Sequence, residues 1–220
     1  MENSIVISWD WYIVRASALV GFLLLYVSIF VGTVSSLPGF KKYFLRLRSL
    51  NFHCWLSLQA FLFALLHAIA LLFHQFIPFG WKDVFIPFHS GFRPILVGLG
   101  TVGFYLMVIL VATSYARKYI SAKLWRTIHF LNIGLYAAVI IHAYYIGTDL
   151  KAGLLRQIFI WANGVLLFLL FCSLFYRIWL RVKKREVSCE INLNDQNENL
   201  RQSYAAFRKK RGDQNWRRRV

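Results

Sequence analysis

One stretch decides the fold: residues 50–76 read LNFHCWLSLQAFLFALLHAIALLFHQF, 27 residues without an Asp, Glu, Lys or Arg. About twenty helical residues are enough to cross the roughly 30 Å hydrocarbon core of a bilayer. The stretch therefore predicts a transmembrane helix. Three histidines lie in it: His74 near its end, where a histidine is usually just solvated, and His53 and His67 at bilayer depth. Ionisable side chains at bilayer depth are costly and tend to be functional, so His53 and His67 are candidate site residues.

Four further apolar stretches extend this prediction to an all-α integral membrane protein with a bundle of about five transmembrane helices. Only 16% of the 220 residues are charged, against about a quarter in a soluble domain. The expected spans are residues 11–34, 50–76, 94–115, 127–146 and 158–180. The first ten residues carry Glu2 and Asp10 but no Lys or Arg. We therefore expect residues 1–10 to be an external N-terminus and not a cleavable signal peptide.

Basic residues alternate between the connections and predict the orientation. The first and third connections hold Lys41, Lys42, Arg46 and Arg48, and Arg117, Lys118, Lys123 and Arg126, with no acidic residue. The other two are poorer in basic residues and contain Asp83 and Asp149. By the positive-inside rule, the basic connections face the cytoplasm. The N-terminus of this multi-pass protein then lies outside the cell membrane and its C-terminus in the cytoplasm.

Residues 181–220 are expected to form a flexible, basic cytoplasmic tail. The clusters at residues 208–211 and 217–219 contribute much of the net charge of +17. A basic segment beside a membrane typically binds anionic lipid head groups, and docking of an acidic partner protein is the second interpretation. Nucleic acid is not expected as a partner, because the tail shows no base-reading motif.

Two more histidines, His129 and His142, lie in the fourth span, thirteen residues apart, whereas His53 and His67 are separated by fourteen. These separations correspond to rises of about 20 and 21 Å along a helix. Because the second and fourth spans run in the same direction, His53 is level with His129 near the cytoplasmic face. His67 is likewise level with His142 near the outer face. Two imidazoles at each level suit the axial positions of a haem iron, which predicts two stacked haems b.

Helical rotation fits the second span better than the fourth. Fourteen residues at about 100° each bring His67 within about 40° of His53, but thirteen leave His142 about 140° from His129. The fourth span must therefore be distorted, or its histidines must reach the two haems from different sides. Gly134 is one place where a distortion could lie.

The sequence resembles the ferric reductase-like transmembrane domain, which includes ferric reductases, the membrane part of NADPH oxidases and the haem subunit of the periplasmic methionine sulfoxide reductase system. The resemblance covers about residues 9–180. It rests on the two histidine pairs, on Tyr12-Ile13-Val14-Arg15-Ala16-Ser17, on Leu124-Trp125-Arg126-Thr127-Ile128-His129 and on Tyr144-Tyr145-Ile146-Gly147-Thr148-Asp149. It implies that residues 11–180 are the haem domain, that the four histidines ligate the iron of two haems, and that electrons flow outwards.

Two arginines take further roles in this resemblance. Arg15 is expected beside a propionate of the outer haem or an anionic acceptor, although snorkelling to the interface is the simpler interpretation. Arg126 is expected at a propionate of the inner haem. Leu71 stands where superoxide-producing relatives carry a further histidine, which argues against a dedicated oxygen-reducing site.

The chain shows no Gly-rich dinucleotide fingerprint after the last span. The expected electron donor is therefore a cytosolic flavoprotein or a quinol. The expected acceptor outside is a ferric chelate or a redox protein. The leading hypothesis is a transmembrane oxidoreductase or the haem subunit of one. The alternatives are a quinone-linked cytochrome b subunit feeding an extracytoplasmic redox partner, and a haem-free membrane scaffold or transporter subunit.

Overall fold

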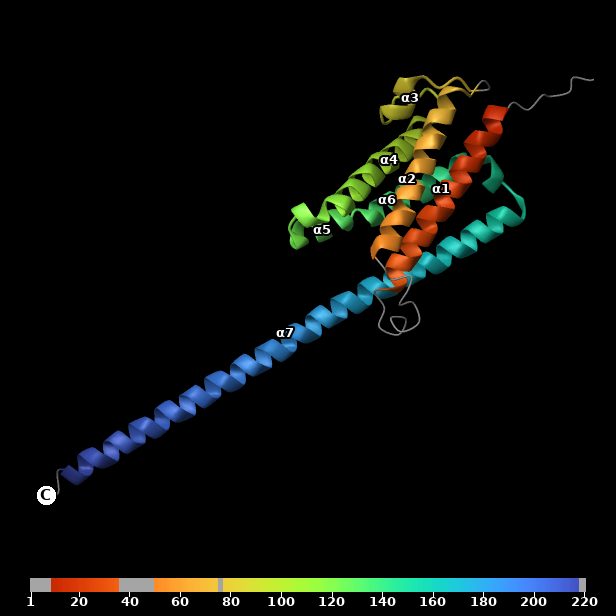
Figure 1. Ribbon diagram of the computed structural model, residues 1–220. Coiled ribbons are helices and arrows are strands. Elements are labelled where there is room, and N and C mark those ends of the chain that lie inside the picture. The colour runs from red at the N-terminus through yellow and green to blue at the C-terminus, as the bar shows by residue number, and fades with distance from the viewer. Residues whose placement is uncertain (1–8, 36–49, 75–76, 218–220) are drawn as a thin grey trace, which may run out of the picture. The chain divides into compact units, whose positions relative to one another are not determined.

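The computed structural model describes residues 9–35, 50–74 and 77–217, and these residues form helices and turns without any strand. The helices are α1 (Trp9–Val34), α2 (Leu50–Leu72), α3 (Trp81–Phe85), α4 (Pro94–Tyr115), α5 (Ala122–His129), α6 (Asn132–Ile146) and α7 (Gly153–Arg217), with 3₁₀ turns η1 (Ala116–Tyr119) and η2 (Thr148–Leu150). Figure 1 shows their order along the chain. The basic residues of the first connection lie outside the described residues.

Five helical segments are long and apolar enough to cross a membrane, which confirms the predicted number and positions. They are Trp9–Val34, Asn51–Leu72, Pro94–Tyr119, Ala122–Ile146 and a stretch within Gly153–Leu200. Many large apolar side chains on these segments are exposed, including Leu23 at 60% and Phe168 at 65%. A soluble monomer rarely exposes so much contiguous apolar surface, whereas a bilayer solvates it. The chain is a multi-pass membrane protein.

The chain divides into two compact units, Met1–Leu170 and Phe171–Val220. All four intramembrane histidines belong to the first unit. In the second unit α7 continues as helix to Arg217, through the segment expected to form the tail. The side chains of the two basic clusters at residues 208–211 and 217–219 lie outside the described part of the chain.

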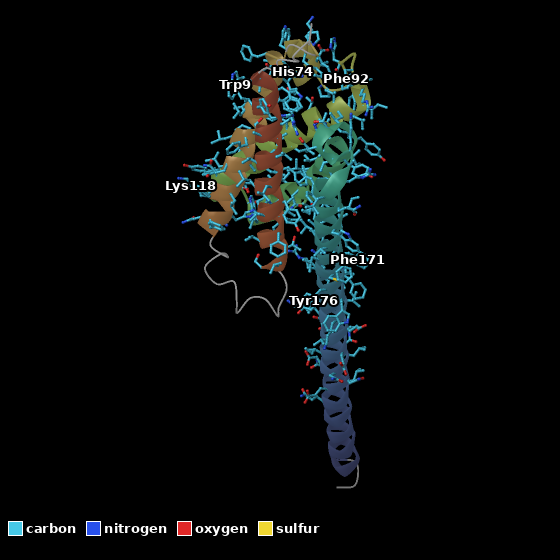
Figure 2. The ribbon with its side chains drawn as sticks, turned by 90° about the vertical axis from the view of Figure 1, so that its right-hand side faces the viewer. Trp9, His74, Phe92, Lys118, Phe171 and Tyr176 are labelled. Atoms are coloured by element: carbon cyan, nitrogen blue, oxygen red, sulfur yellow. The ribbon has the colours of Figure 1, made fainter. Side chains whose placement is uncertain are left out.

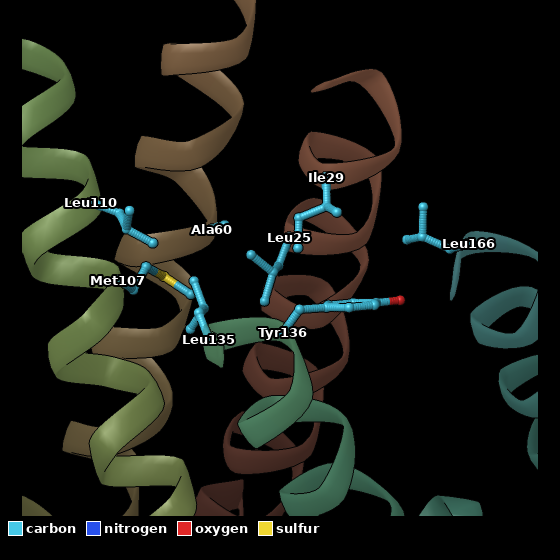
Figure 3. Packing of buried hydrophobic residues seen from close by; sticks show 8 residues of the cluster. All are labelled: Leu25, Ile29, Ala60, Met107, Leu110, Leu135, Tyr136 and Leu166. Atoms are coloured by element: carbon cyan, nitrogen blue, oxygen red, sulfur yellow. The ribbon is translucent and has the colours of Figure 1, made fainter. Parts of the chain in front are cut away.

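The core of the first unit joins five helices between the two histidine levels. It contains Leu25 and Ile29 of α1, Ala60 of α2, Met107 and Leu110 of α4, Leu135 and Tyr136 of α6, and Leu166 of α7. Leu135 points towards Met107, whereas the Tyr136 ring points to the opposite side, towards Leu166 (Figure 3). The Tyr136 hydroxyl donates to Asn163 Oδ1 of α7, so this buried polar group is satisfied.

The fourth span is broken in two, which is the first of the two alternatives that its helical rotation left open. α5 ends at His129 and α6 begins at Asn132, so the break lies at Phe130–Leu131 and not at Gly134. The amides of Phe130, Leu131 and Ile133 donate to carbonyls three residues earlier. Three residues turned at about 120° instead of about 100° add about 60° of rotation. The tight turn thereby removes a large part of the mismatch between His129 and His142.

Beyond the end of α2, the short helix α3 packs against α4. The hydroxyls of Thr101 and Tyr105 donate to the carbonyls of Val84 (2.9 Å) and Phe85 (2.8 Å). Trp9, His74 and Phe92 lie at this same end of the first unit (Figure 2). The α3 region thus lies at the end of the bundle that carries His67 and His142.

Candidate functional site

The two inner histidines come together from α2 and α5. The ring centroids of His53 and His129 are 6.1 Å apart, and their planes are crossed at 70°. A metal–imidazole bond of about 2.0–2.1 Å, plus about 1.1 Å from that nitrogen to the ring centre, would place two axial imidazoles about 6 Å apart. The spacing of this pair therefore suits ligands on either side of one metal atom.

His53 is held by two serines. Its Nδ1 lies 3.2 Å from the Ser28 hydroxyl of α1, which lies 2.9 Å from the Ser57 hydroxyl. The Ser57 hydroxyl in turn reaches the His53 carbonyl at 2.9 Å. Only 3% of the Ser28 surface is exposed. Because Nδ1 is engaged in this way, Nε2 is the ring nitrogen left for a ligand bond.

His129 is held by its own helix. The Trp125 ring stacks on the His129 ring, with centroids 4.9 Å apart and planes 19° from parallel. Residues four apart lie on one face of a helix, so α5 enforces the stack. The Arg117 guanidinium lies 5.8 Å from the centre of the Trp125 ring. The inner pair therefore lies next to the basic connection between α4 and α5.

The two outer histidines are anchored to backbone carbonyls of neighbouring helices. Nδ1 of His67 in α2 is 3.0 Å from the Val14 carbonyl of α1. Nδ1 of His142 in α6 is 2.8 Å from the Leu96 carbonyl of α4. A carbonyl can only accept, so Nδ1 is the protonated nitrogen of each neutral ring. Histidines that bind metals usually donate one ring N–H to a carbonyl in this way, which leaves Nε2 as the ligand atom.

Gly100 of α4 makes room for the His142 ring. A Cβ at this position would lie 2.6 Å from Cε1 and 2.7 Å from Nδ1 of His142. Both distances are far below a carbon contact of about 3.5–4.0 Å. Only glycine lets the imidazole lie this close to the α4 backbone, and sequence analysis gave no sign of this role.

The donor set fits haem better than a bare metal ion. No group of three or more His, Cys, Asp or Glu gathers around a common point within the described residues. Tetrahedral zinc sites take three or four protein ligands, whereas a haem iron takes two axial ones. The buried Trp125 Nε1 finds no hydrogen-bond acceptor among the described residues. A group bound beside His129 would supply one.

Arg15 was predicted near the outer haem or an anionic acceptor, and the structure pairs it with Asp149. Its Nε donates to Asp149 Oδ2 at 2.8 Å, and a guanidinium nitrogen contacts the other carboxylate oxygen. The guanidinium also lies 3.9 Å from the centre of the Trp11 ring. Asp149 was part of a motif noted in the sequence, but its pairing across the bundle could not be foreseen. Arg126 is exposed on α5.

The two remaining histidines, His74 and His89, each have a carboxylate partner. His74 Nδ1 is 3.0 Å from Asp10 and only 9% of its side chain is exposed, so it is not the solvated loop residue expected from its position. His89 Nδ1 is 3.0 Å from Asp83. The Gly80 amide and His89 together lower the pKa of Asp83 below its ordinary value, because both hydrogen bonds favour the carboxylate. Both pairs lie at the end of the bundle that carries His67 and His142.

Comparison with known families gives a match that spans more than half of the chain. Residues 17–141 match the family described as the ferric reductase like transmembrane component. The matched range includes His53, His67 and His129 and ends one residue before His142. No curated protein and no solved structure matches the chain.

Proposed function

The chain belongs to the ferric reductase-like transmembrane family, and on this premise we propose that it carries electrons across the cell membrane through two haems b. His53 and His129 would hold the inner haem, and His67 and His142 the outer one. The observation that carries the proposal is the inner pair. Two imidazoles from different helices lie 6.1 Å apart, close to the spacing of about 6 Å that two axial ligands need.

Each side chain then has a defined task. When bound, haem supplies a one-electron couple at its iron, which no side chain of the bundle provides. His53, His67 and His142 would bind through Nε2, because Nδ1 of each is engaged by a neighbouring group, and His129 would supply the fourth imidazole. The carbonyls of Val14 and Leu96 accept hydrogen bonds from Nδ1 of His67 and His142. The Ser28 hydroxyl contacts Nδ1 of His53. The core around Ala60 and Leu135, exposed by 0% and 3%, excludes water between the levels.

The proposed direction is from the cytoplasm outwards. Among the described connections, the one between α4 and α5 carries Arg117 and Lys118. The helix α5 itself carries Lys123 and Arg126, and neither segment holds an acidic residue. The positive-inside rule places this end, and with it the inner pair, on the cytoplasmic side. A cytosolic flavoprotein or a quinol would be oxidised there. Each electron delivered outside would reduce one ferric ion of a chelate to the ferrous state, or one centre of a redox protein.

The test is haem stoichiometry and identity in purified variants. The full chain should contain about two haems by pyridine haemochrome. His53→Ala and His129→Ala should each remove the same haem, and His67→Ala and His142→Ala the other, as identified by midpoint potential. An iron that loses one of two strong ligands becomes five-coordinate and weakly held.

The matched controls are His74→Ala and His89→Ala, which replace histidines paired with carboxylates and should leave both haems bound. Folded protein with one haem or none would refute the two-level arrangement. Loss of the same haem from His53→Ala and His142→Ala would show that the pairs are crossed. Absorption spectroscopy of the wild type also separates this function from a haem-free scaffold.

A further inference from the structure

Trp125 lies next to the inner histidine pair but is not one of the four proposed haem ligands. It lies on α5 one turn before His129, and the two rings are nearly parallel at 4.9 Å. The stack is broad and flat, so rotation of the imidazole about its Cβ–Cγ bond would drive it into the indole. The indole thereby fixes the plane of the His129 ring.

The plane of the partner ring is fixed by a separate contact. His53 Nδ1 is in hydrogen-bonding contact with the Ser28 hydroxyl of α1. The Ser28 hydroxyl also contacts the Ser57 hydroxyl of α2. The two imidazole planes consequently stand at 70° to each other. The contact of His53 with Ser28 does not involve α5, and the stack of His129 on Trp125 does not involve α2. The angle between the two rings therefore depends on two independent contacts.

The indole also carries an unused hydrogen-bond donor. Trp125 Nε1 is buried and has no acceptor among the described residues. A buried N–H without an acceptor is unfavourable, because it has lost its hydrogen bond to water and gained none in return. A cation lies close by, since the Arg117 guanidinium is 5.8 Å from the centre of the indole ring. A donor beside a cationic side chain suits an anionic acceptor.

We propose that Trp125 is a positioning residue of the inner haem site. Its ring holds His129 crossed to His53, and its N–H donates to a carboxylate of the bound haem. This inference rests on the proposed function. It adds a residue that binds no iron but sets the geometry of the ligand field and the affinity for the porphyrin.

Ring orientation has a spectroscopic signature that protein stability alone would not move. In a low-spin ferric haem, the π orbitals of parallel imidazoles lift the same iron d orbital, whereas crossed imidazoles leave two d orbitals nearly degenerate. Near-degeneracy gives a highly anisotropic EPR signal with a large maximal g value. The angle of 70° between the inner rings predicts such a signal for the inner haem.

The experiment uses the full chain with haem bound and compares Trp125→Phe with Trp125→Leu. Phenylalanine keeps a stacking ring but has no N–H, so the EPR signal should be retained while inner-haem affinity falls about 10–100-fold, as for other second-shell partners. Leucine removes both features, so the maximal g value should also fall. The matched control is Trp161→Leu, since Trp161 is 73% exposed on α7 and should change neither quantity.

The outcomes separate this proposal from the proposed function. An unchanged EPR signal in Trp125→Leu would overturn the positioning role, and unchanged haem affinity in Trp125→Phe would overturn the donor role. The outer haem, which should stay bound in both variants, reports that the bundle is folded. Wild-type protein without haem would instead refute the proposed function itself.

Discussion

Gly100→Ala should weaken the outer haem site although it replaces none of the proposed ligands. The added Cβ would lie 2.6 Å from Cε1 of His142, about 1 Å inside the closest comfortable carbon contact. The imidazole must therefore move by about that distance, or α4 and α6 must separate. The 2.8 Å contact between His142 Nδ1 and the Leu96 carbonyl does not survive such a shift, because amide-type hydrogen bonds end near 3.2 Å.

The size of the effect follows from these two losses. Overpacking a tight interior site costs about 1–3 kcal/mol, and loss of the Nδ1 contact costs about 1 kcal/mol. Loss of a second-shell partner typically lowers metal affinity about 10–100-fold. We expect outer-haem affinity to fall within this range while the inner haem stays bound.

The assay is haem titration of the purified full chain, with the two haems distinguished by midpoint potential. Gly164→Ala is the matched control, because Gly164 lies inside α7 and a Cβ added there would meet no atom within 4 Å. Both substitutions also raise helix propensity, because alanine favours a helix over glycine by about 0.5–1 kcal/mol. The difference in outer-haem affinity between the two variants therefore isolates the effect of the clash with His142. Unchanged outer-haem affinity in Gly100→Ala would show that His142 is not held against α4 in the working protein. The Leu96 carbonyl would then not orient His142 for haem binding.

Three further predictions concern the inner level and the outer edge. Ser28→Ala should lower inner-haem affinity about 10–100-fold and spare the outer haem, since it removes the Nδ1 partner of one inner ligand; haem titration checks this. Arg15→Ala should keep both haems but slow reduction of an anionic external acceptor, whereas Asp149→Asn frees the guanidinium and should not slow it; steady-state reduction rates distinguish the two. The pKa of Asp83 is depressed in the folded state, so its stabilising contribution is complete above the ordinary carboxyl pKa and is lost as pH falls through the depressed value. His89→Ala should raise that pKa and shift the loss to higher pH, as followed by NMR titration of the carboxyl group.

The number and positions of the spans could be predicted because they depend on length and hydropathy alone. The levels of the histidines could also be predicted, since the rise per residue of a helix is nearly constant. These two quantities were enough to pair His53 with His129, and the structure brings their rings to 6.1 Å. The pairing survives the break in the fourth span because a short 3₁₀ turn changes rotation more than rise.

The location of that break could not be predicted from local sequence. The rotation of His129 against His142 required a distortion, but residues 130 and 131 are Phe and Leu, and neither is a helix breaker. Gly134 was the plausible candidate by composition, yet it lies within the first turn of α6. The tightening becomes visible only in the backbone hydrogen bonds of the folded chain, where the amides of Phe130 and Leu131 donate to carbonyls three residues earlier.

The contacts that hold the histidines were hidden for a related reason. Val14 and Leu96 act through their carbonyls, so side-chain identity carries no signal at either position. Each outer imidazole is fixed by the helix that precedes its own span, and each contact exists only while α1 lies against α2 or α4 against α6. A ligand nitrogen that is oriented by helix packing is preorganised only in the folded bundle. Haem binding and assembly of the helices should therefore be thermodynamically coupled, and variants that loosen either helix pair should lose outer haem before they lose helical structure.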